Sequence, residues 1–338
     1  MHTDSIAQLA DIDALERSGD VVGALDAAVR ANRAEPSLDL QRLLVDLRER
    51  AASVHRSTPR SPWPLDLADP FPDLPGDAVP EIPASELTSE LMGAAILHHG
   101  SLLVRGLFDA ERVERTAGSI IGAVDSALAE PADRNPGCFE PRRGAGRRTS
   151  ILRAEVLDQH GVWLADSPRA LAQVLDDLDE VGVIAAVGEH FAERPVISLE
   201  KSTLRRSQPT FRYAAWHQDG SFLGPAARAL NVWVALSPCG GDRPTPGLEL
   251  VSGRVPRILP RDGVGNASID GMEVHVFAQM EGLSVTRPLF DPGDALLFDE
   301  LMAHRTHLRE GMTEERLALE CWFFAPSNPA ENYGFLLV

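Results

Sequence analysis

Hydrophobic residues recur at helical spacing from residue 4 to about residue 54. Ile6, Leu9 and Ala10 illustrate the pattern, in which apolar side chains three and four positions apart share one face of a helix. The pattern predicts two or three amphipathic helices, and we treat residues 1–55 as an N-terminal helical module. We expect this module either to pack against the rest of the chain as an extension or to serve in docking or dimerisation.

The helical pattern stops between about residues 56 and 84, a segment that contains eight prolines and almost no periodicity. Each proline removes a backbone donor and biases the preceding residue towards extended geometry, so the segment is predicted to be a linker across the surface. A helix is predicted next, with Ser85 as its cap and Gly100 as its stop. A buried strand at 101–107 and a helix starting near Asp109 follow.

Further along the chain the spacing becomes strand-like. Helical patterns at 167–178 and 180–192 are followed by short apolar runs bounded by glycine and proline, which are typical of a β-sandwich or barrel. The predicted fold class is mainly β with flanking helices, and the principal domain is expected at residues 85–338. The predicted strands lie at 196–204, 214–219, 229–236, 247–253, 273–277, 294–298 and 316–324.

Composition narrows the function classes. The chain has 338 residues, of which 44% are hydrophobic and 24% charged, as expected for a folded globular protein. Its formal charge of −18 argues against nucleic acid and anionic membranes as partners. No apolar run approaches the roughly 20 residues that span a bilayer, and no signal peptide is recognised, so a cytoplasmic location is expected. Three widely spaced cysteines indicate neither a disulfide framework nor a zinc site.

Candidate chemistry begins with the sequence Trp-His-Gln-Asp-Gly at the end of a predicted strand. In an extended chain, residues two apart point to the same face, so His217 and Asp219 can offer an imidazole and a carboxylate to one ion. An isolated pair of this kind is common without a metal. The pair gains weight from a second segment, in which His304 follows a glycine-containing turn and an apolar strand, and Arg316 precedes another strand.

Two histidines and one carboxylate on one face of an octahedral ion leave three positions open, the arrangement of non-haem iron(II) oxygenases. Two open positions suit a chelating 2-oxo acid and one suits dioxygen. The distal carboxylate of such an acid is matched by an arginine, whose planar guanidinium can donate two parallel hydrogen bonds. Arg316 is placed to make this contact.

Four ordered motifs resemble the phytanoyl-CoA dioxygenase family of Fe(II)/2-oxoglutarate-dependent oxygenases over roughly residues 82–326. They are WHQDGSF, LNVWVAL, PGLELVSG and PGDALLFD with the following histidine and arginine. The resemblance implies a double-stranded β-helix (jelly-roll, cupin-like) barrel that uses Fe(II), 2-oxoglutarate as cosubstrate and O2. It further implies His217, Asp219 and His304 as metal ligands, Arg316 as the 2-oxoglutarate clamp, and Trp233 and Asn231 as the wall beside the cosubstrate.

Several of these assignments have rivals within the sequence. His307 competes with His304, and the family spacing favours His304. Arg309 competes with Arg316, but Arg309 precedes a Glu-Gly turn and is expected to be exposed. Trp233 could instead serve ordinary core packing and Asn231 a turn or cap. A second polar contact to 2-oxoglutarate could come from any of three basic residues, Lys201, Arg205 and Arg206.

The intact carboxylate at Asp219 favours hydroxylation over halogenation, because related halogenases replace it with a small residue. We therefore expect a hydroxylase that acts on a small molecule and releases succinate and CO2. Two alternatives are a non-catalytic metal-binding sensor or interaction module on the same barrel and a cupin-like metalloenzyme without 2-oxoglutarate. Four arginines in the 132–149 segment predict a lid over an anionic or carrier-linked substrate, with a solvated surface loop as the alternative: Arg142, Arg143, Arg147 and Arg148.

Overall fold

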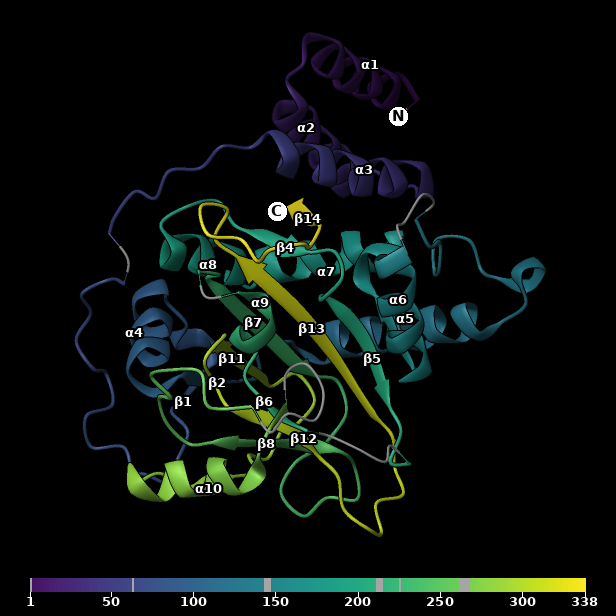
Figure 1. Cartoon of the computed structure of the whole chain (residues 1–338). Helices are drawn as coiled ribbons and strands as arrows, with labels where there is room; N and C mark the ends of the chain where they lie inside the picture. The colour runs from purple at the N-terminus through teal and green to yellow at the C-terminus, as the bar shows by residue number, and fades with distance from the viewer. Residues whose placement is uncertain (1, 63, 143–146, 211–214, 225, 262–267) are drawn as a thin grey trace.

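The computed structural model describes residues 2–62, 64–142, 147–210, 215–224, 226–261 and 268–338. Three helices form the N-terminal part, as the apolar spacing predicts: α1 (His2–Ser18), α2 (Val21–Ala34) and α3 (Leu38–Val54). Asp20 and Ser37 cap α2 and α3, because their side chains accept hydrogen bonds from Gly23 N and Leu40 N. The three helices lie together at one end of the molecule (Figure 1).

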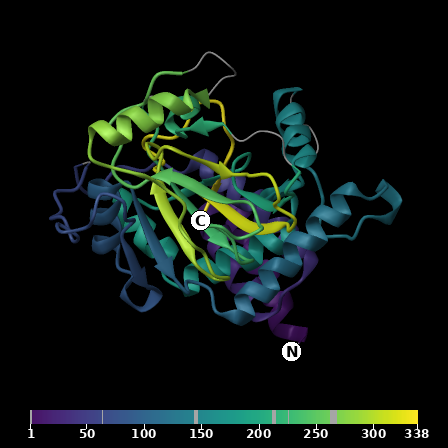
Figure 2. The ribbon, with the colours of Figure 1, turned by 90° about the horizontal axis from the view of Figure 1, so that it is seen from below.

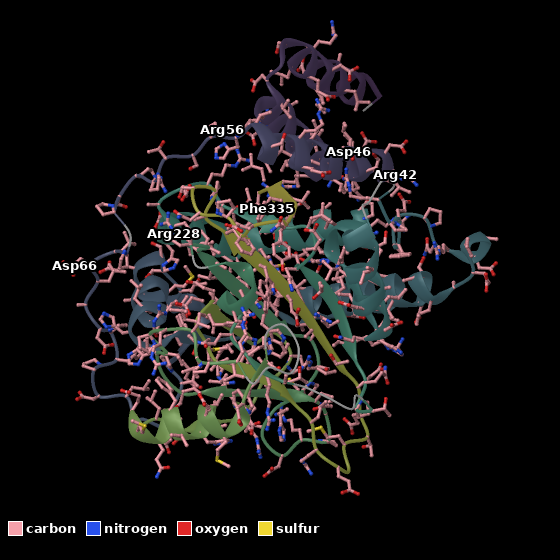
Figure 3. All side chains as sticks on the ribbon, in the orientation of Figure 1. Arg42, Asp46, Arg56, Asp66, Arg228 and Phe335 are labelled. Atoms are coloured by element: carbon pink, nitrogen blue, oxygen red, sulfur yellow. The ribbon has the colours of Figure 1, made fainter. Side chains whose placement is uncertain are left out.

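The N-terminal helices pack against the rest of the chain. One buried apolar cluster combines Leu25 and Leu47 from these helices with Trp322, Phe324 and Leu337 from the body. Helix α3 makes the main contact, against α7 (Pro168–Glu180) and the last strand, β14 (Phe335–Leu337), and Phe335 lies beneath it (Figure 3). This packing agrees with the packed-extension alternative, and the alternative of docking or dimerisation stays a prediction.

The proline-rich segment crosses from these helices to the opposite end of the body (Figure 1). Its described residues from 56 to 80 carry neither helix nor strand. Helix α4 (Ser89–His99) follows, capped by Thr88 rather than by Ser85, which lies in a preceding 3-10 turn. Gly100 ends α4 with a φ of 82°, as predicted, because glycine adopts the left-handed conformation without a steric penalty.

Helices surround most of the body. Asp109 caps α5 at the predicted position. The larger sheet is covered by α5, α7 and α8, which share with its strands the largest buried apolar cluster. No helix among the described residues is long and apolar enough to cross a membrane. The helices of the body after α4 are α5 (Ala110–Leu128), α6 (Arg147–Asp158), α7 (Pro168–Glu180), α8 (Val183–Phe191), α9 (Gly220–Leu223) and α10 (Gly271–Met280).

The strands form two sheets. The smaller has five strands in the order β10, β8, β12, β6, β9, and the larger has nine, with β13 pairing β7, β5 and β4. The larger sheet contains β1 (Glu81–Pro83), β2 (Ser101–Arg105), β3 (Gly161–Trp163), β4 (Val196–Ser198), β5 (Thr203–Ser207), β7 (Ala229–Ala235), β11 (Ala295–Asp299), β13 (Arg316–Phe324) and β14 (Phe335–Leu337). The smaller contains β6 (Trp216–His217), β8 (Gly247–Val251), β9 (Ser268–Ile269), β10 (Val285–Thr286) and β12 (His304–His307).

The two sheets pack face to face. Leu103, Trp233 and Leu296 of the larger sheet share a buried cluster with Leu248 and Leu250 of the smaller one. Among the described strands, no backbone ladder joins one sheet to the other. The fold is therefore a mixed α/β arrangement of two sheets with N-terminal helices, and not the mainly β fold that was expected, because helices occupy more of the described chain than strands do.

The segment at 273–277 is the clearest error in the predicted strands, because it lies within α10. Val274, Phe277 and Ala278 are buried, whereas Val276 is 46% exposed, so burial follows a spacing of three and four residues. Asp270 begins the helix by accepting a hydrogen bond from Met272 N. The alternating valines, Val274 and Val276, therefore led to a predicted strand where the chain forms a helix. Figures 1 and 2 place α10 at the opposite end of the molecule from the N-terminal helices.

Candidate metal and cosubstrate site

Strand register brings the three predicted metal ligands together. His304 at the start of β12 is the Cα partner of His217 at the end of β6, and their ring centroids are 4.3 Å apart. Asp219 Oδ1 lies 3.7 Å from His217 Nε2 and 4.0 Å from His304 Nε2. One potential ligand atom from each residue lies within 4.8 Å of the other two. The triad therefore fits a facial metal site.

Asp219 reaches this position by a route that differs from the predicted one. The strand ends at His217, and Asp219 has helical backbone angles of φ −60° and ψ −37° at the start of α9. The two side chains converge through a turn and not through the alternation of an extended chain. The pairing of His217 with Asp219 was correctly predicted, but its geometric reason was wrong.

Backbone carbonyls fix the orientation of both imidazoles. His217 Nδ1 lies 3.0 Å from Ala215 O, and His304 Nδ1 lies 3.1 Å from Met302 O. Since a carbonyl only accepts, each Nδ1 carries the proton and each Nε2 keeps a lone pair that faces Asp219. Metal-bound histidines usually donate their other ring N–H to a carbonyl or carboxylate in this way, which fixes the ring.

Asp219 and His304 are buried and His217 is partly buried, and the charge of Lys201 acts on both Asp219 and His217. Burial raises the pKa of Asp219 well above its usual value and lowers the pKa of His304 well below its own. Burial also lowers the pKa of His217. Asp219 is 2% exposed, and its Oδ1 has no hydrogen-bond partner among the described residues. Two neutral imidazoles and one orphaned carboxylate oxygen form a donor set that suits a divalent cation.

Gln218, between the two ligands, was missed by sequence reasoning. Its side chain is fully buried and its Nε2 donates to Arg257 O at 2.9 Å and to Leu301 O at 2.6 Å. Its Oε1 accepts from Leu259 N at 2.7 Å. Gln218 thereby ties the turn that carries Asp219 to the chain just before His304, and it is a positioning residue for the triad.

The triad opens into a pocket of about 510 Å³ that also contains Arg316. Arg316 is 2% exposed and begins β13. Its Nη1 donates to Gly247 O at 3.1 Å and its Nη2 donates to Ser207 Oγ at 3.0 Å. Its Nε has no acceptor, and no carboxylate of the described chain lies within ion-pair distance of the guanidinium. Burial lowers the pKa of Arg316.

Trp233 and Asn231 of β7 line the same pocket. The Arg316 guanidinium carbon lies 5.3 Å from the Trp233 ring, and Trp233 also packs edge-on against Phe290 at 4.9 Å. Asn231 lies within the strand, so the turn or cap alternative is wrong for it. Asn231 Oδ1 and Trp233 Nε1 are both buried without partners among the described residues.

The rival residues lie elsewhere. His307 is not part of the triad and pairs in register with Gly247 at the far end of β12. Arg309 is exposed, as expected, and donates to Asp242 O. Arg206 pairs with Glu315 and Asp125 and does not line the pocket. The remaining two basic candidates, Lys201 and Arg205, both line it.

Two further pocket residues were not among the predicted site residues. Glu320 is held by Thr203 Oγ1 at 2.7 Å and by Arg205 at 3.3 Å, and these contacts lower the pKa that burial would raise. Phe222 lies 4.2 Å from the Lys201 ammonium. The alternation along β13 would have identified Glu320, since it points to the same face as Arg316.

The arginine-rich segment does not form the predicted lid at Arg142, because Arg142 pairs with Asp46 at 3.0 Å and with Glu49 on α3. Arg143 lies outside the described residues, as do the side chains of Arg147 and Arg148. Helix α6 nevertheless lines the pocket, through Leu152, Glu155 and Val156.

Comparisons with known proteins yield distant structural likenesses. No family model matches this sequence, and no curated protein sequence matches it. The chain is similar to the structure of EctD from S. alaskensis with 2-oxoglutarate and 5-hydroxyectoine, with a TM-score of 0.49 and 18% identity over 71% of this chain and 77% of that one. It is similar to SnoK, a non-heme alpha ketoglutarate dependent carbocyclase from nogalamycin biosynthesis, with a TM-score of 0.47 and 14% identity over 75% and 98%. EvdO2 from Micromonospora carbonacea var. aurantiaca, complexed with 2-oxoglutarate, gives a TM-score of 0.46 and 15% identity over 73% and 91%.

Proposed function

We propose that this chain is an Fe(II)- and 2-oxoglutarate-dependent dioxygenase of the phytanoyl-CoA dioxygenase type, which hydroxylates an unactivated C–H bond of a small molecule. One observation carries the proposal. A two-histidine, one-carboxylate triad lines the same pocket as a buried arginine that has no ion-pair partner among the described residues. A simple metal-binding site requires the triad but has no use for the arginine.

In this proposal the metal ligands are His217 Nε2, Asp219 and His304 Nε2. The orphaned Asp219 oxygen and the two oriented imidazoles would hold the ion, and all three residues line the pocket. When bound, iron(II) and 2-oxoglutarate would supply the oxidising chemistry, with O2 as the oxidant and succinate and CO2 as by-products. The protein's contribution is to hold these groups in position and to exclude water.

Arg316 would bind the distal carboxylate of 2-oxoglutarate. Gly247 O and Ser207 Oγ hold the guanidinium in place before the cosubstrate arrives, and burial strengthens a charge-assisted hydrogen bond because little water competes. Trp233 and Asn231 would form the adjacent wall, where their unpartnered polar atoms can contact the cosubstrate.

We also propose a domain division on this basis. Residues 85–338 would form the oxygenase domain, with its two sheets acting as the two halves of a double-stranded β-helix. Residues 1–55 would be a helical module and residues 56–84 the linker between them. The face-to-face packing of the sheets supports the oxygenase domain, and the lack of helix and strand in the described residues 56–80 supports the linker.

Anaerobic absorption spectroscopy on metal-free protein tests the function. Iron(II) is added first and 2-oxoglutarate second, beside a His217→Ala variant. We expect a visible charge-transfer band that needs both additions and is absent from the variant. If the wild type binds iron but shows no band, a cupin-like enzyme or a metal-binding sensor becomes the better reading.

A further inference from the structure

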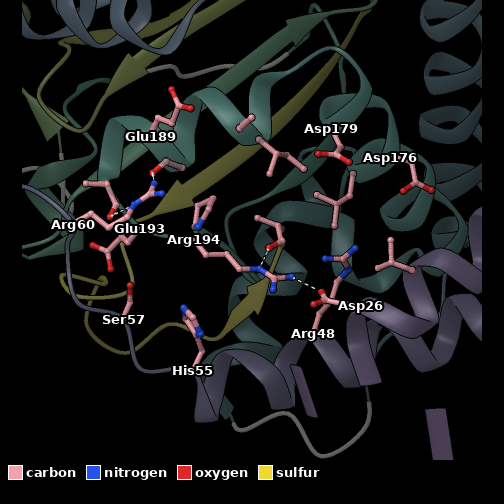
Figure 4. Close-up of a pocket in the computed structure, with 18 of the residues that line it drawn as sticks. Asp26, Arg48, His55, Ser57, Arg60, Asp176, Asp179, Glu189, Glu193 and Arg194 are labelled. Carbon is pink, nitrogen blue, oxygen red and sulfur yellow. Dashed lines mark hydrogen bonds and ion pairs between the residues drawn. The ribbon is translucent and has the colours of Figure 1, made fainter. Parts of the chain in front are cut away.

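A second cleft lies between the N-terminal helices and the body. Its volume is about 840 Å³, and none of the residues that line it also lines the metal pocket. Helices α2 and α3 form one wall, and α7, α8 and the end of the chain form the other (Figure 4). Its size falls within the range of small-molecule sites, roughly 300–1,000 Å³.

Arg48 of α3 is the unusual residue of this cleft. It is 6% exposed, and its Nη1 donates to Leu337 O at 2.8 Å. Its Nε is buried without an acceptor, and no carboxylate of the described chain forms an ion pair with it. The pKa of Arg48 is lowered to about 10, chiefly by burial, with the charges of Arg194 and Arg33 acting in the same direction and those of Asp176 and Asp26 opposing them. A buried, uncompensated cation is costly, so this position would be stabilised by an anion.

The nearby carboxylates are already engaged by other arginines. Asp26 pairs with Arg194 at 3.0 Å. Asp176 and Asp179 each pair with Arg33 at 2.8 Å. Figure 4 shows Arg48 and Arg194 on either side of Asp26, with only the Arg194 contact within bonding distance. The local acids therefore balance Arg33 and Arg194, and Arg48 has no ion-pair partner of its own among the described residues.

His55 and several apolar side chains also line this cleft. His55 follows α3 and lines the cleft, and its Nε2 is buried without a partner among the described residues. Val29, Leu175 and Ile184 supply apolar surface. Six arginines line the cleft against five carboxylates, in a chain whose formal charge is −18. The cleft is thus locally favourable to an anion that also carries some apolar surface.

We propose that this cleft binds a small organic anion, whose carboxylate or phosphate group is held by Arg48 with help from Arg194 and His55. Arg48 and Arg194 already donate to the backbone oxygens of Leu337 and Val338. An anion at this point would therefore tighten α3 on the last strand. The site is separate from the proposed oxygenase reaction and does not depend on it.

Thermal unfolding of the full chain with inorganic phosphate, acetate or chloride tests this site. We expect phosphate or acetate to raise the unfolding midpoint in a saturable manner, and chloride at equal ionic strength to leave it unchanged. The more effective of the two anions identifies the group that the cleft accepts. Hydrogen exchange should slow in α3 and in the last strand under the same conditions.

Variants locate the effect. Arg48→Met keeps the apolar stem and should abolish the anion-dependent shift, whereas Arg50→Gln, two residues along the same helix and outside the cleft, should retain it. Should Arg48→Met fail to fold, His55→Gln carries the test, with an expected apparent affinity at least threefold weaker. His217→Ala should keep the full shift, which separates this site from the metal centre. An absent shift, or an equal shift in His55→Gln and wild type, overturns the proposal.

Discussion

The two arginine-containing cavities are built in contrasting ways. Arg316 lies at the start of a central strand, and the partners that hold it are Ser207 of the neighbouring strand β5 and Gly247 of β8 in the facing sheet. Arg48 lies on a helix that reaches the body only through tertiary packing, and its neighbours come from both ends of the chain. The first cavity is formed by strands of the two sheets, and the second is formed where the N-terminal helices pack against the body. Changes to either cavity should therefore have separable effects.

The largest effect is expected from His304→Ala, since it removes one of three ligands. Loss of a residue that only hydrogen-bonds to a metal ligand lowers metal affinity roughly ten- to hundredfold, and we expect iron(II) affinity to fall by more than that here. His307→Ala, three residues along the same strand, is the matched control and should retain iron binding. Calorimetric titration with iron(II) under anaerobic conditions measures both. Comparable losses in the two variants would contradict the assignment of His304.

This contrast also explains how much of the site the sequence could predict. Arg316 could be proposed because it begins a predicted strand soon after His304 and matches the family motif, and the structure places it in the same pocket as the triad. Gln218 was missed because its partners Leu259 and Leu301 are 41 and 83 residues away, and no local pattern encodes such contacts. Strand-like alternation was misleading at 273–277. Val274 and Val276 suggested a strand there, but the segment is part of the capped helix α10.

The N-terminal cleft shows the same limit more strongly. Helical spacing predicted the elements of residues 1–55, because amphipathic periodicity is local. It did not predict which face of α3 meets the body or that Arg48 would be buried there, since an arginine on a helix is usually solvated. Which surfaces dock depends on the complete shapes of both partners.

A smaller effect, confined to the cosubstrate, is expected from Arg316→Lys. Lysine keeps the positive charge but cannot donate two parallel hydrogen bonds as a planar guanidinium does. The loss of about 1.5–3 kcal/mol of charge-assisted hydrogen bonding should weaken 2-oxoglutarate binding roughly ten- to hundredfold. Iron(II) binding should be preserved. The matched control is Arg309→Lys at the exposed rival position, which should bind 2-oxoglutarate normally. The iron-dependent absorption band, titrated with 2-oxoglutarate, distinguishes the two variants, and equal affinities would exclude Arg316 as the clamp.

Gln218→Leu should weaken the metal site without touching the metal. Its three hydrogen bonds to backbone groups are lost, and the freed groups are buried, which costs about 1–3 kcal/mol per unsatisfied group. We expect iron(II) affinity to fall by about ten- to hundredfold, as for a second-shell residue. Gln218→Glu retains the acceptor for Leu259 N, so only Gln218→Leu should lose both kinds of contact. Iron affinity unchanged in both variants would show that the triad is positioned without Gln218.

The smallest expected effect is a loss of folding stability in mild acid, caused by a buried histidine of the body. His190 of α8 is 1% exposed, and burial lowers its pKa to about 3, with smaller contributions from the charges of Arg254 and Arg228. In the unfolded chain a histidine titrates near 6.5. Between these two values the unfolded state binds a proton that the folded state does not, so stability falls as the pH falls below 6.5. At pH 5.5 this one group should lower the free energy of unfolding by about 1.4 kcal/mol relative to neutral pH.

Denaturant unfolding of wild type and His190→Gln at pH 7.5 and 5.5 measures this difference in stability, which the variant should lack. Equal acid sensitivity in the two proteins would mean that His190 is not the group responsible.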